Sequence, residues 1–418
     1  MNFDDFYRLI GFSLFIAVAV RTKQAFTLTF MSLANFALYA FTKPMIVADY
    51  FQSYNNIQYC ILSALFVYSM GALLGSQVDI NRNLVINPPN ITVQISNVYL
   101  PSFVGVILVT LHLALLGHTP FEAINDPISA RWALGNGGNI LFQAFWTNYL
   151  IITAIYIFFS PKRLFHRVLG VVICLVWFPL LSIRAPLIDF VLTVIVIRSF
   201  IIGKRGFSLL GGVSFAILAL LLISTLGVVR LSAQTGRSLE EIIGSAPSVL
   251  NVSSLLLDLI LQRLDYLDVL RAAEARLHEL VLPPLPFIYN LMPRGLFLEK
   301  LFSSDTQVTE LAGAGFDEEN ITRIVGIVAE MMSSDSIFIF GLIYLFTLGI
   351  IYKLIDRCRR ISRGGLFLYA RLLPAAGGLP LLGGWNTIYL SSFVLNLIMS
   401  VLIIHFYEKS FPLRSTDR

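Results

Sequence analysis

The apolar stretch Ser336–Tyr352, SIFIFGLIYLFTLGIIY, is followed directly by the basic stretch Lys353–Arg363, KLIDRCRRISR. The first stretch carries no charge and approaches the roughly 20 residues that a helix needs to cross a bilayer. The second is rich in Lys and Arg, which gather in the cytoplasmic loops of membrane proteins. Together the two stretches predict a membrane-spanning helix that ends in the cytoplasm.

Composition extends this interpretation from one helix to the whole chain. The protein has 418 residues, of which 56% are hydrophobic and 13% are charged. A soluble domain carries about 25% charged residues. These values exclude a soluble cytosolic enzyme and an intrinsically disordered protein. The net charge of +5 is typical of cytoplasmic loops, so we expect no nucleic-acid partner.

We expect an all-α polytopic membrane protein with about 11 transmembrane helices. The candidate spans are Phe6–Val20, Phe26–Phe41, Ile57–Leu74, Val98–Leu116, Ile140–Phe159, Val168–Ile183, Pro186–Ile201, Phe207–Val229, Ser336–Tyr352, Leu366–Leu382 and Trp385–Phe406. With this number, all the basic loops and the C-terminal tail lie on the cytoplasmic side. The acidic N-terminus, MNFDDF, lies on the other side, and we expect no cleavable signal peptide there.

A long polar segment divides the spans into two groups. We expect an N-terminal bundle of about eight spans at 1–229, a large loop at 230–335, and the last helices with a cytoplasmic tail at 336–418. Of the 25 acidic residues, 14 lie between Arg230 and Met332, which indicates a solvated region. The loop would face the periplasm.

The large loop is too long for a plain connection, so we expect helices within it. Asn251–Leu280 fits a helix that Asn251 caps and that ends before two prolines. Asp317–Met332 fits a second helix, because three acidic residues at its start suit the positive end of the helix dipole.

Several soluble-enzyme motifs are absent from the sequence. It has no GxxxxGK phosphate loop, no GxGxxG turn and no HExxH pair, and its five histidines are scattered. We therefore expect neither a metal nor a cofactor.

Several arginines lie on the expected non-cytoplasmic side, although Lys and Arg usually gather in cytoplasmic loops. Arg184 interrupts an apolar hairpin, WFPLLSIRAPLIDFVLTVI, at its outer turn. A charge near the membrane commonly faces an interior or an aqueous cavity. Two structural alternatives remain, because Arg184 could reach the lipid headgroups or pair with Asp189.

Arg263 and Arg271 form a second set. At about 100° per residue, both fall on the apolar face of the expected helix Asn251–Leu280. A guanidinium there needs a partner. The partner is either Glu274, three residues after Arg271, or an anionic ligand.

Further cations accompany these arginines. Arg294 follows a proline, Lys300 lies six residues later, and Arg230 begins the loop as a common interfacial arginine would. Guanidinium groups bind phosphate oxygens in pairs. Several of them at one cavity would suit a diphosphate and stabilise charge as it leaves.

Few residues are candidates for a general base. Glu330, in IVAEMMSSD, lies where the loop re-enters the membrane, and partial desolvation there could tune its carboxyl. His278 and Asp265 are alternatives, and each of the three also fits a plain surface or capping role. Tyr266 and His278 complete the candidate substrate-binding residues.

The architecture resembles that of the bacterial O-antigen and capsule repeat-unit polymerases. The letters that carry the resemblance are Pro293-Arg294 followed by Glu299-Lys300, and then Glu330 and Gly341 in VAEMMSSDSIFIFG. The resemblance implies a C-type membrane glycosyltransferase fold in the bacterial inner membrane, with its active site facing the periplasm.

By the same resemblance, the protein would join oligosaccharide repeats on undecaprenyl diphosphate without a metal. Arg184, Arg263, Arg294 and Glu330 would be its catalytic residues. Arg230, Arg271, Lys300, Tyr266 and His278 would bind the lipid-linked glycan. A flippase and a chain-length regulator would be its partners.

Two alternatives remain open. A ligase-like transferase would move the glycan to another acceptor. A transporter or flippase would need polar residues deep within the spans, which we expect to be mostly Leu, Ile, Val and Phe.

Overall fold

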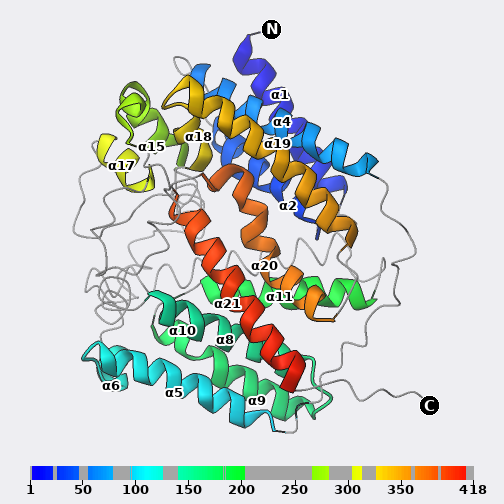
Figure 1. Cartoon of the computed structure of the whole chain (residues 1–418), viewed down its shortest axis with the longest axis vertical. Coiled ribbons are helices and arrows are strands. Elements are labelled where there is room, and N and C mark those ends of the chain that lie inside the picture. Colours follow the sequence, from blue (N-terminus) through cyan, green and yellow to red (C-terminus); the bar gives the residue numbers. More distant parts are fainter. Residues whose placement is uncertain are drawn as a thin grey trace, which may run out of the picture. The chain divides into compact units, whose positions relative to one another are not determined.

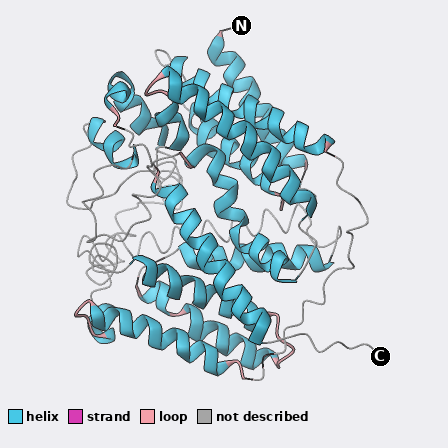
Figure 2. Ribbon diagram, in the orientation of Figure 1, coloured by secondary structure: helices cyan, strands magenta, loops and turns pink. Residues whose placement is uncertain are grey.

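The structure is a computed structural model, and its description covers most of the chain outside the long loop. The described residues are 2–21, 26–46, 55–78, 95, 97–125, 140–181, 183, 185–202, 266–281, 304–312, 326–358, 363–384 and 387–410. About 88% of them are helical and none of them lies in a strand (Figure 2). The all-α prediction is therefore confirmed for this part of the chain.

Five helices in the described ranges are long and apolar enough to cross a membrane. They are Asn55–Gln77, Leu141–Phe158, Asp335–Arg357, Gly364–Leu382 and Ser392–Ser410. This agrees with the membrane-spanning class that the composition predicts. The candidate span Phe207–Val229 lies outside the described residues.

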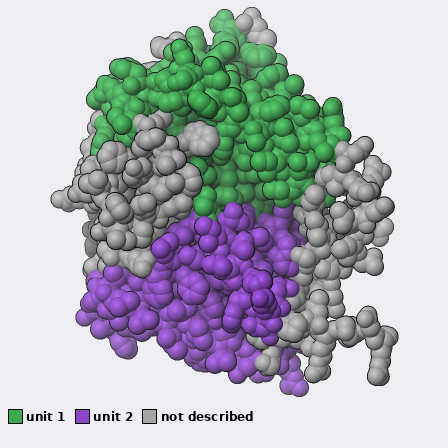
Figure 3. Space-filling view, viewed as in Figure 1, with its two compact units in different colours: residues 1–85, 260–359, 373–394 green, residues 86–259, 360–372, 395–418 purple. Residues whose placement is uncertain are grey.

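The chain divides into two compact units, and each unit combines three separate stretches of sequence (Figure 3). Unit 1 comprises 1–85, 260–359 and 373–394, and unit 2 comprises 86–259, 360–372 and 395–418. Helices α20 (Arg363–Leu382) and α21 (Ile388–Ser410) contribute residues to both.

Unit 1 joins helices from the N-terminus with helices from the second half of the chain (Figure 1). Its elements besides parts of α20 and α21 are α1 (Phe3–Val20), α2 (Leu28–Asn35), the π-helix η2 (Phe36–Phe41), α3 (Thr42–Ile46), α4 (Asn55–Gln77), α15 (Tyr266–Ala273), the 3₁₀ helix η5 (Glu274–Glu279), α17 (Ser304–Leu311), α18 (Gly326–Met331) and α19 (Asp335–Cys358).

Helices α4 and α19 pack side by side in unit 1 and run in the same direction. Near their starts, the ring of Tyr59 stacks on that of Phe338 with 6.4 Å between centroids. Near their ends, Nη1 of Arg357 donates to the main-chain carbonyl of Ser76 at 3.3 Å. The residue numbers of the contacting pairs increase in the same direction along both helices, so the two helices are parallel.

Small residues bring these two helices close together. A Cβ at Gly71 would overlap the main-chain carbonyl of Phe346, and a Cβ at Gly349 would overlap that of Tyr68. Gly and other small residues are typical of helix contacts in membranes, where close packing replaces the hydrophobic effect between helices.

The end of α19 also holds the start of α2. Oδ1 of Asp356 accepts the main-chain N–H of Leu28 at 2.8 Å, and Oδ2 accepts the N–H of Thr29 at 3.1 Å. A carboxylate at a helix N-terminus satisfies free N–H groups and the helix dipole. Asp356 is 8% exposed, so this contact belongs to the core of unit 1.

Unit 2 is built around α8 (Ile140–Phe158). Its other elements are α5 (Tyr99–Leu115), α6 (Pro120–Asn125), α9 (Leu164–Leu175), α10 (Trp177–Leu180), α11 (Ala185–Ile202) and the remaining parts of α20 and α21. Helices α5, α9 and α11 pack on α8. Indole Nε1 of Trp146 contacts Nδ1 of His112 at 2.9 Å in this core.

Helices α8 and α21 are also parallel. Asn148 of α8 lies beside Asn396 of α21 at 2.7 Å, and further along both helices Tyr156 donates to Oε1 of Glu408 at 2.9 Å. The residue numbers of the contacting pairs again increase in the same direction along both helices.

Two predicted spans are less regular than expected. Within the predicted span Val168–Ile183, the apolar helix Leu164–Leu180 is interrupted at Val176, since α9 ends at Leu175 and α10 begins at Trp177. Pro179 explains the break, since it has no N–H to donate to the carbonyl of Leu175. The predicted span Phe26–Phe41 contains α2 and then the π-helix η2.

The predicted loop helices are only partly regular. Within Asn251–Leu280, the described part is α15 followed by the 3₁₀ helix η5. The continuous helix predicted for Asp317–Met332 is wrong at Gly326, whose φ is 67°. This left-handed conformation interrupts an α-helix and favours glycine, so α18 begins there.

Candidate functional site

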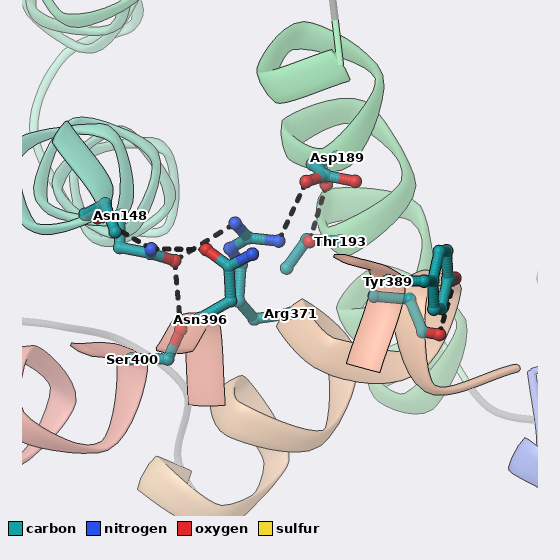
Figure 4. Close-up of polar contacts among 9 residues, drawn as sticks. Asn148, Asp189, Thr193, Arg371, Tyr389, Asn396 and Ser400 are labelled. Atoms are coloured by element: carbon teal, nitrogen blue, oxygen red, sulfur yellow. Dashed lines mark hydrogen bonds and ion pairs between the residues drawn. The ribbon is translucent and has the colours of Figure 1, made fainter. Parts of the chain in front are cut away.

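Arg371 places a guanidinium group within the apolar helix α20, where the residue is only 3% exposed. Its Nη1 lies 3.0 Å from Oδ2 of Asp189 on α11, and its Nη2 donates to Oδ1 of Asn148 on α8 at 3.1 Å (Figure 4). A buried charge is costly unless both its charge and its donors are matched. These contacts supply a counter-charge and partners for two of the three guanidinium nitrogens, and they join three helices.

Asn148 extends the contacts to α21. Its Nδ2 donates to Oδ1 of Asn396 at 2.7 Å, and Oγ of Ser400 donates to Oδ1 of Asn148 at 3.1 Å. We call Asn148, Asp189, Arg371, Asn396 and Ser400 the Arg371 cluster. All five residues belong to unit 2.

The Arg371 cluster is not fully satisfied. Nε of Arg371 is buried and has no hydrogen-bond partner within the described ranges. The side chain of Asp189 is 30% exposed, whereas that of Arg371 is 4% exposed, so the carboxylate is the accessible end of the ion pair. Ionisable residues within membrane helices commonly mark functional sites; a structural pair that fixes four helices together is the alternative.

Sequence reasoning misses the Arg371 cluster. The expectation that the spans are plain apolar helices is wrong for α8, α11, α20 and α21 of unit 2. The signal is visible in the letters, because Arg371 interrupts LFLYARLLP and Asn148 interrupts AFWTNYLII. Asp189 pairs with Arg371; Arg184, the partner considered from sequence, lies outside the described residues.

Glu330 is the predicted catalytic residue that the structure describes. It lies on the short helix α18 and is 0% exposed. A Cβ at Gly384 would overlap its carboxylate, so the carboxylate occupies the space that a side chain at position 384 would fill. Tyr344 of α19 also interacts electrostatically with Glu330.

A turn after α20 provides the space for this carboxylate. The N–H of Gly384 donates to Oγ1 of Thr387 at 2.9 Å, and this hydroxyl donates back to the carbonyl of Gly384 at 3.0 Å. Thr387 is 0% exposed. The turn is thus held by its own hydrogen bonds, next to a buried carboxylate.

The described helices of the long loop gather in unit 1. Helix α17 packs against α15, η5 and α18, and α18 also packs against α4 and α19. This arrangement brings the elements that carry Tyr266, Arg271, His278 and Glu330 into one unit. Arg271 is half-buried and His278 is exposed.

The charge of Arg271 has a small effect on the carboxyl group of Glu274. Burial raises the pKa of the Glu274 carboxyl above its ordinary value of 4.5, while a hydrogen bond with Asn56 of α4 and the charge of Arg271 lower it. Burial has the largest effect. The contact also links η5 to the start of α4.

The other predicted site residues, Arg184, Arg230, Arg263, Arg294 and Lys300, lie outside the described residues. The convergence of these cations on a diphosphate therefore stays a prediction. In the part of the chain that is described, no group of three or more His, Cys, Asp or Glu side chains is placed to hold a metal ion.

Comparisons with protein-family models, curated proteins and solved structures found no match to this chain. The functional interpretation consequently depends on residues and contacts. Two buried charged sites provide them, one around Glu330 in unit 1 and one around Arg371 in unit 2.

Proposed function

We propose that the chain is a membrane glycosyltransferase that polymerises oligosaccharide repeat units carried on undecaprenyl diphosphate. The observation that carries the proposal is the fully buried carboxylate of Glu330, on a short helix just before the membrane helix α19. A carboxylate held away from bulk water and close to a membrane can take a proton from a substrate hydroxyl.

The proposed enzyme lies in the bacterial inner membrane with about 11 spans, and its loop faces the periplasm. The direction of helix packing supports this topology. Two spans can be parallel only if the chain crosses the membrane an odd number of times between them. The α4–α19 pair is parallel, and so is the α8–α21 pair. In the proposed order these are the third and ninth spans and the fifth and eleventh, which satisfies both conditions.

In the proposed reaction, a hydroxyl of the acceptor sugar attacks the anomeric carbon of the donor glycan. A glycosidic bond forms while the bond from that carbon to the diphosphate oxygen breaks. Glu330 takes the proton of the hydroxyl, and undecaprenyl diphosphate leaves with the bonding electrons. Arg184, Arg263 and Arg294 stabilise the charge of the diphosphate.

Further residues complete the proposed substrate site. Arg230, Arg271, Lys300, Tyr266 and His278 would contact the lipid-linked glycan. A flippase that delivers repeats and a regulator of chain length would be the protein partners. A ligase-like transferase would use the same chemistry, and only its acceptor differs.

The test is to replace Glu330 by Gln in cells that lack the native copy of the protein. We expect glycan chains to grow about 100- to 10,000-fold more slowly, because the general base is lost, so that single repeats accumulate on surface lipid. Glu310→Gln is the matched control, since Glu310 is an exposed carboxylate on α17. Full-length glycan ladders from Glu330→Gln would remove Glu330 from the reaction.

A transporter or flippase of lipid-linked sugars is the second candidate, and the Arg371 cluster favours it. Polar residues between spans commonly mark transport pathways. Purified protein in liposomes separates the two functions. Glycan growth without translocation supports the polymerase, whereas translocation without growth supports the transporter.

A further inference from the structure

A pocket lined by both cations and apolar side chains lies within unit 2. It is formed by the end of α8, the connection to α9, the α9 helix itself and α11, and its volume is about 790 Å³. This is within the range of ligand pockets, roughly 300 to 1,000 Å³. Lys162, Arg167 and Arg198 line it, and its described lining residues include no carboxylate.

Among the described residues, no carboxylate neutralises the three cations of this pocket. Nη1 of Arg167 donates to the main-chain carbonyl of Phe158 at 3.2 Å, which holds the guanidinium group at the pocket. Its Nε is buried and has no hydrogen-bond partner among the residues that the structure describes. Over the described ranges, Lys162, Arg167 and Arg198 form no ion pair with a carboxylate. The pocket therefore attracts an anion, and guanidinium groups favour phosphate oxygens.

The apolar lining of the pocket includes an exposed stripe on α9. Val168 and Val172 line the pocket and are 52% and 51% exposed, and Leu164, one turn earlier, also lines it and is 67% exposed. These residues are four apart and lie on one face of the helix. In a chain with membrane-spanning helices, an exposed apolar stripe of this kind is in contact with acyl chains.

We infer that this pocket binds an anionic phospholipid. Its phosphate lies among Lys162, Arg167 and Arg198, and its acyl chain lies along Leu164, Val168 and Val172. Basic pockets next to membrane helices are suited to such headgroups. Free phosphate would satisfy the cations but not the apolar stripe. The inference is independent of the proposed reaction, because Glu330 belongs to unit 1 and the Arg371 cluster does not line this pocket.

Lipid binding to the detergent-purified full-length protein tests the inference by native mass spectrometry. We expect phosphatidylglycerol to bind on the order of 100-fold more tightly than phosphatidylcholine, because no choline cation offsets its phosphate charge and each of the three cations contributes about fivefold. Inorganic phosphate at the same concentration should not displace the lipid. This arm uses the wild-type protein, so it does not depend on the folding of any variant.

Variants then locate the site. Arg167→Gln should weaken binding of phosphatidylglycerol about fivefold, and combining it with Lys162→Gln and Arg198→Gln should abolish the preference over phosphatidylcholine. Arg163→Gln is the matched control, since Arg163 is an exposed cation in the same connection that does not line the pocket. Equal binding of the two lipids, displacement by inorganic phosphate, or equal losses from Arg163→Gln and Arg167→Gln would each overturn the inference.

Discussion

Arg371 in unit 2 and Glu330 in unit 1 are both almost completely buried, but they are held in different ways. Arg371 contacts Asp189 and Asn148, which lie on two other helices. The carboxylate of Glu330 lies against Gly384, which has no side chain to fill the volume that the carboxylate occupies. The first arrangement balances charge within the membrane helices. The second keeps a carboxylate in a volume that a larger residue would close.

This difference predicts different responses to mutation. Removing a partner from the Arg371 cluster should mainly change stability, because an uncompensated charge is left in the core. Changing the surroundings of Glu330 should mainly change the packing of a small volume. Two predictions test the comparison, and a third concerns Glu274, another carboxylate of unit 1; they follow in order of decreasing effect.

Asp189→Leu should have the largest effect on stability. It leaves the guanidinium of Arg371, whose side chain is 4% exposed, without its counter-charge. Breaking a buried pair in this way costs about 3 to 5 kcal/mol. The measurement is the thermal unfolding midpoint of the detergent-purified protein, which should fall clearly.

The reverse change and the double variant provide the controls. Arg371→Met should cost less, because the Asp189 carboxylate that remains is 30% exposed. Arg371→Met combined with Asp189→Leu should be more stable than Asp189→Leu alone, since no buried charge remains. If the double variant is no more stable, the ion pair does not account for the effect.

Gly384→Ala should have an intermediate effect on unit 1. The new Cβ overlaps the carboxylate of Glu330, and overpacking of this kind costs about 1 to 3 kcal/mol. A double-mutant cycle with Glu330→Ala measures the coupling, because removing the carboxylate should make the alanine at 384 nearly harmless. Additive losses in stability would show that the two residues do not share this space.

Glu274 should give the smallest effect, visible as a dependence on pH. Burial raises the pKa of its carboxyl above 4.5 in the folded protein, so the unfolded chain loses this proton first as the pH rises. The contribution to the free energy of unfolding is therefore unchanged below about pH 4.5 and falls as the pH rises from there through the folded pKa. Glu274→Gln should remove this decline.

Glu279→Gln is the matched control for this pH series. A hydrogen bond from Arg276, 2.9 Å from Nε to Oε1, lowers the pKa of the exposed Glu279 carboxyl. Its stabilising effect is present above its ordinary value of 4.5 and is lost as the pH falls through the folded pKa. The two substitutions should thus change the unfolding midpoint in opposite senses between about pH 4 and pH 6.

Periodicity and apolar runs predict the long helices well. The predicted spans Ile57–Leu74 and Ser336–Tyr352 lie within α4 and α19. Such helices are predictable because a long apolar run is a local feature of the sequence. Breaks within helices are harder to foresee. Pro179 ends α9, whereas α20 continues through Pro374 and Pro380, and the difference depends on what surrounds each proline.

The candidate site is less predictable than the helices. Glu330 is visible as an acidic residue at the edge of an apolar stretch, but its complete burial depends on Gly384, which is 54 residues later in the chain. Asn148 and Arg371 are 223 residues apart. Spacing along one helix contains no information on such pairs, because they are created only when separate helices pack.

The contact of α4 with α19 can form only after α19 has been synthesised, long after α4 has entered the membrane. Asp356 bonds to Leu28, 328 residues earlier, so the first helices leave the ribosome long before their final neighbour. At about 5 to 20 residues per second, the interval from the end of α4 to the start of α19 lasts roughly 10 to 50 seconds. During that time, the surface around Gly71 has lipid or an insertion factor as its neighbour. Cells must therefore protect a half-built protein, and slow translation of the central region would prolong its exposure to membrane proteases.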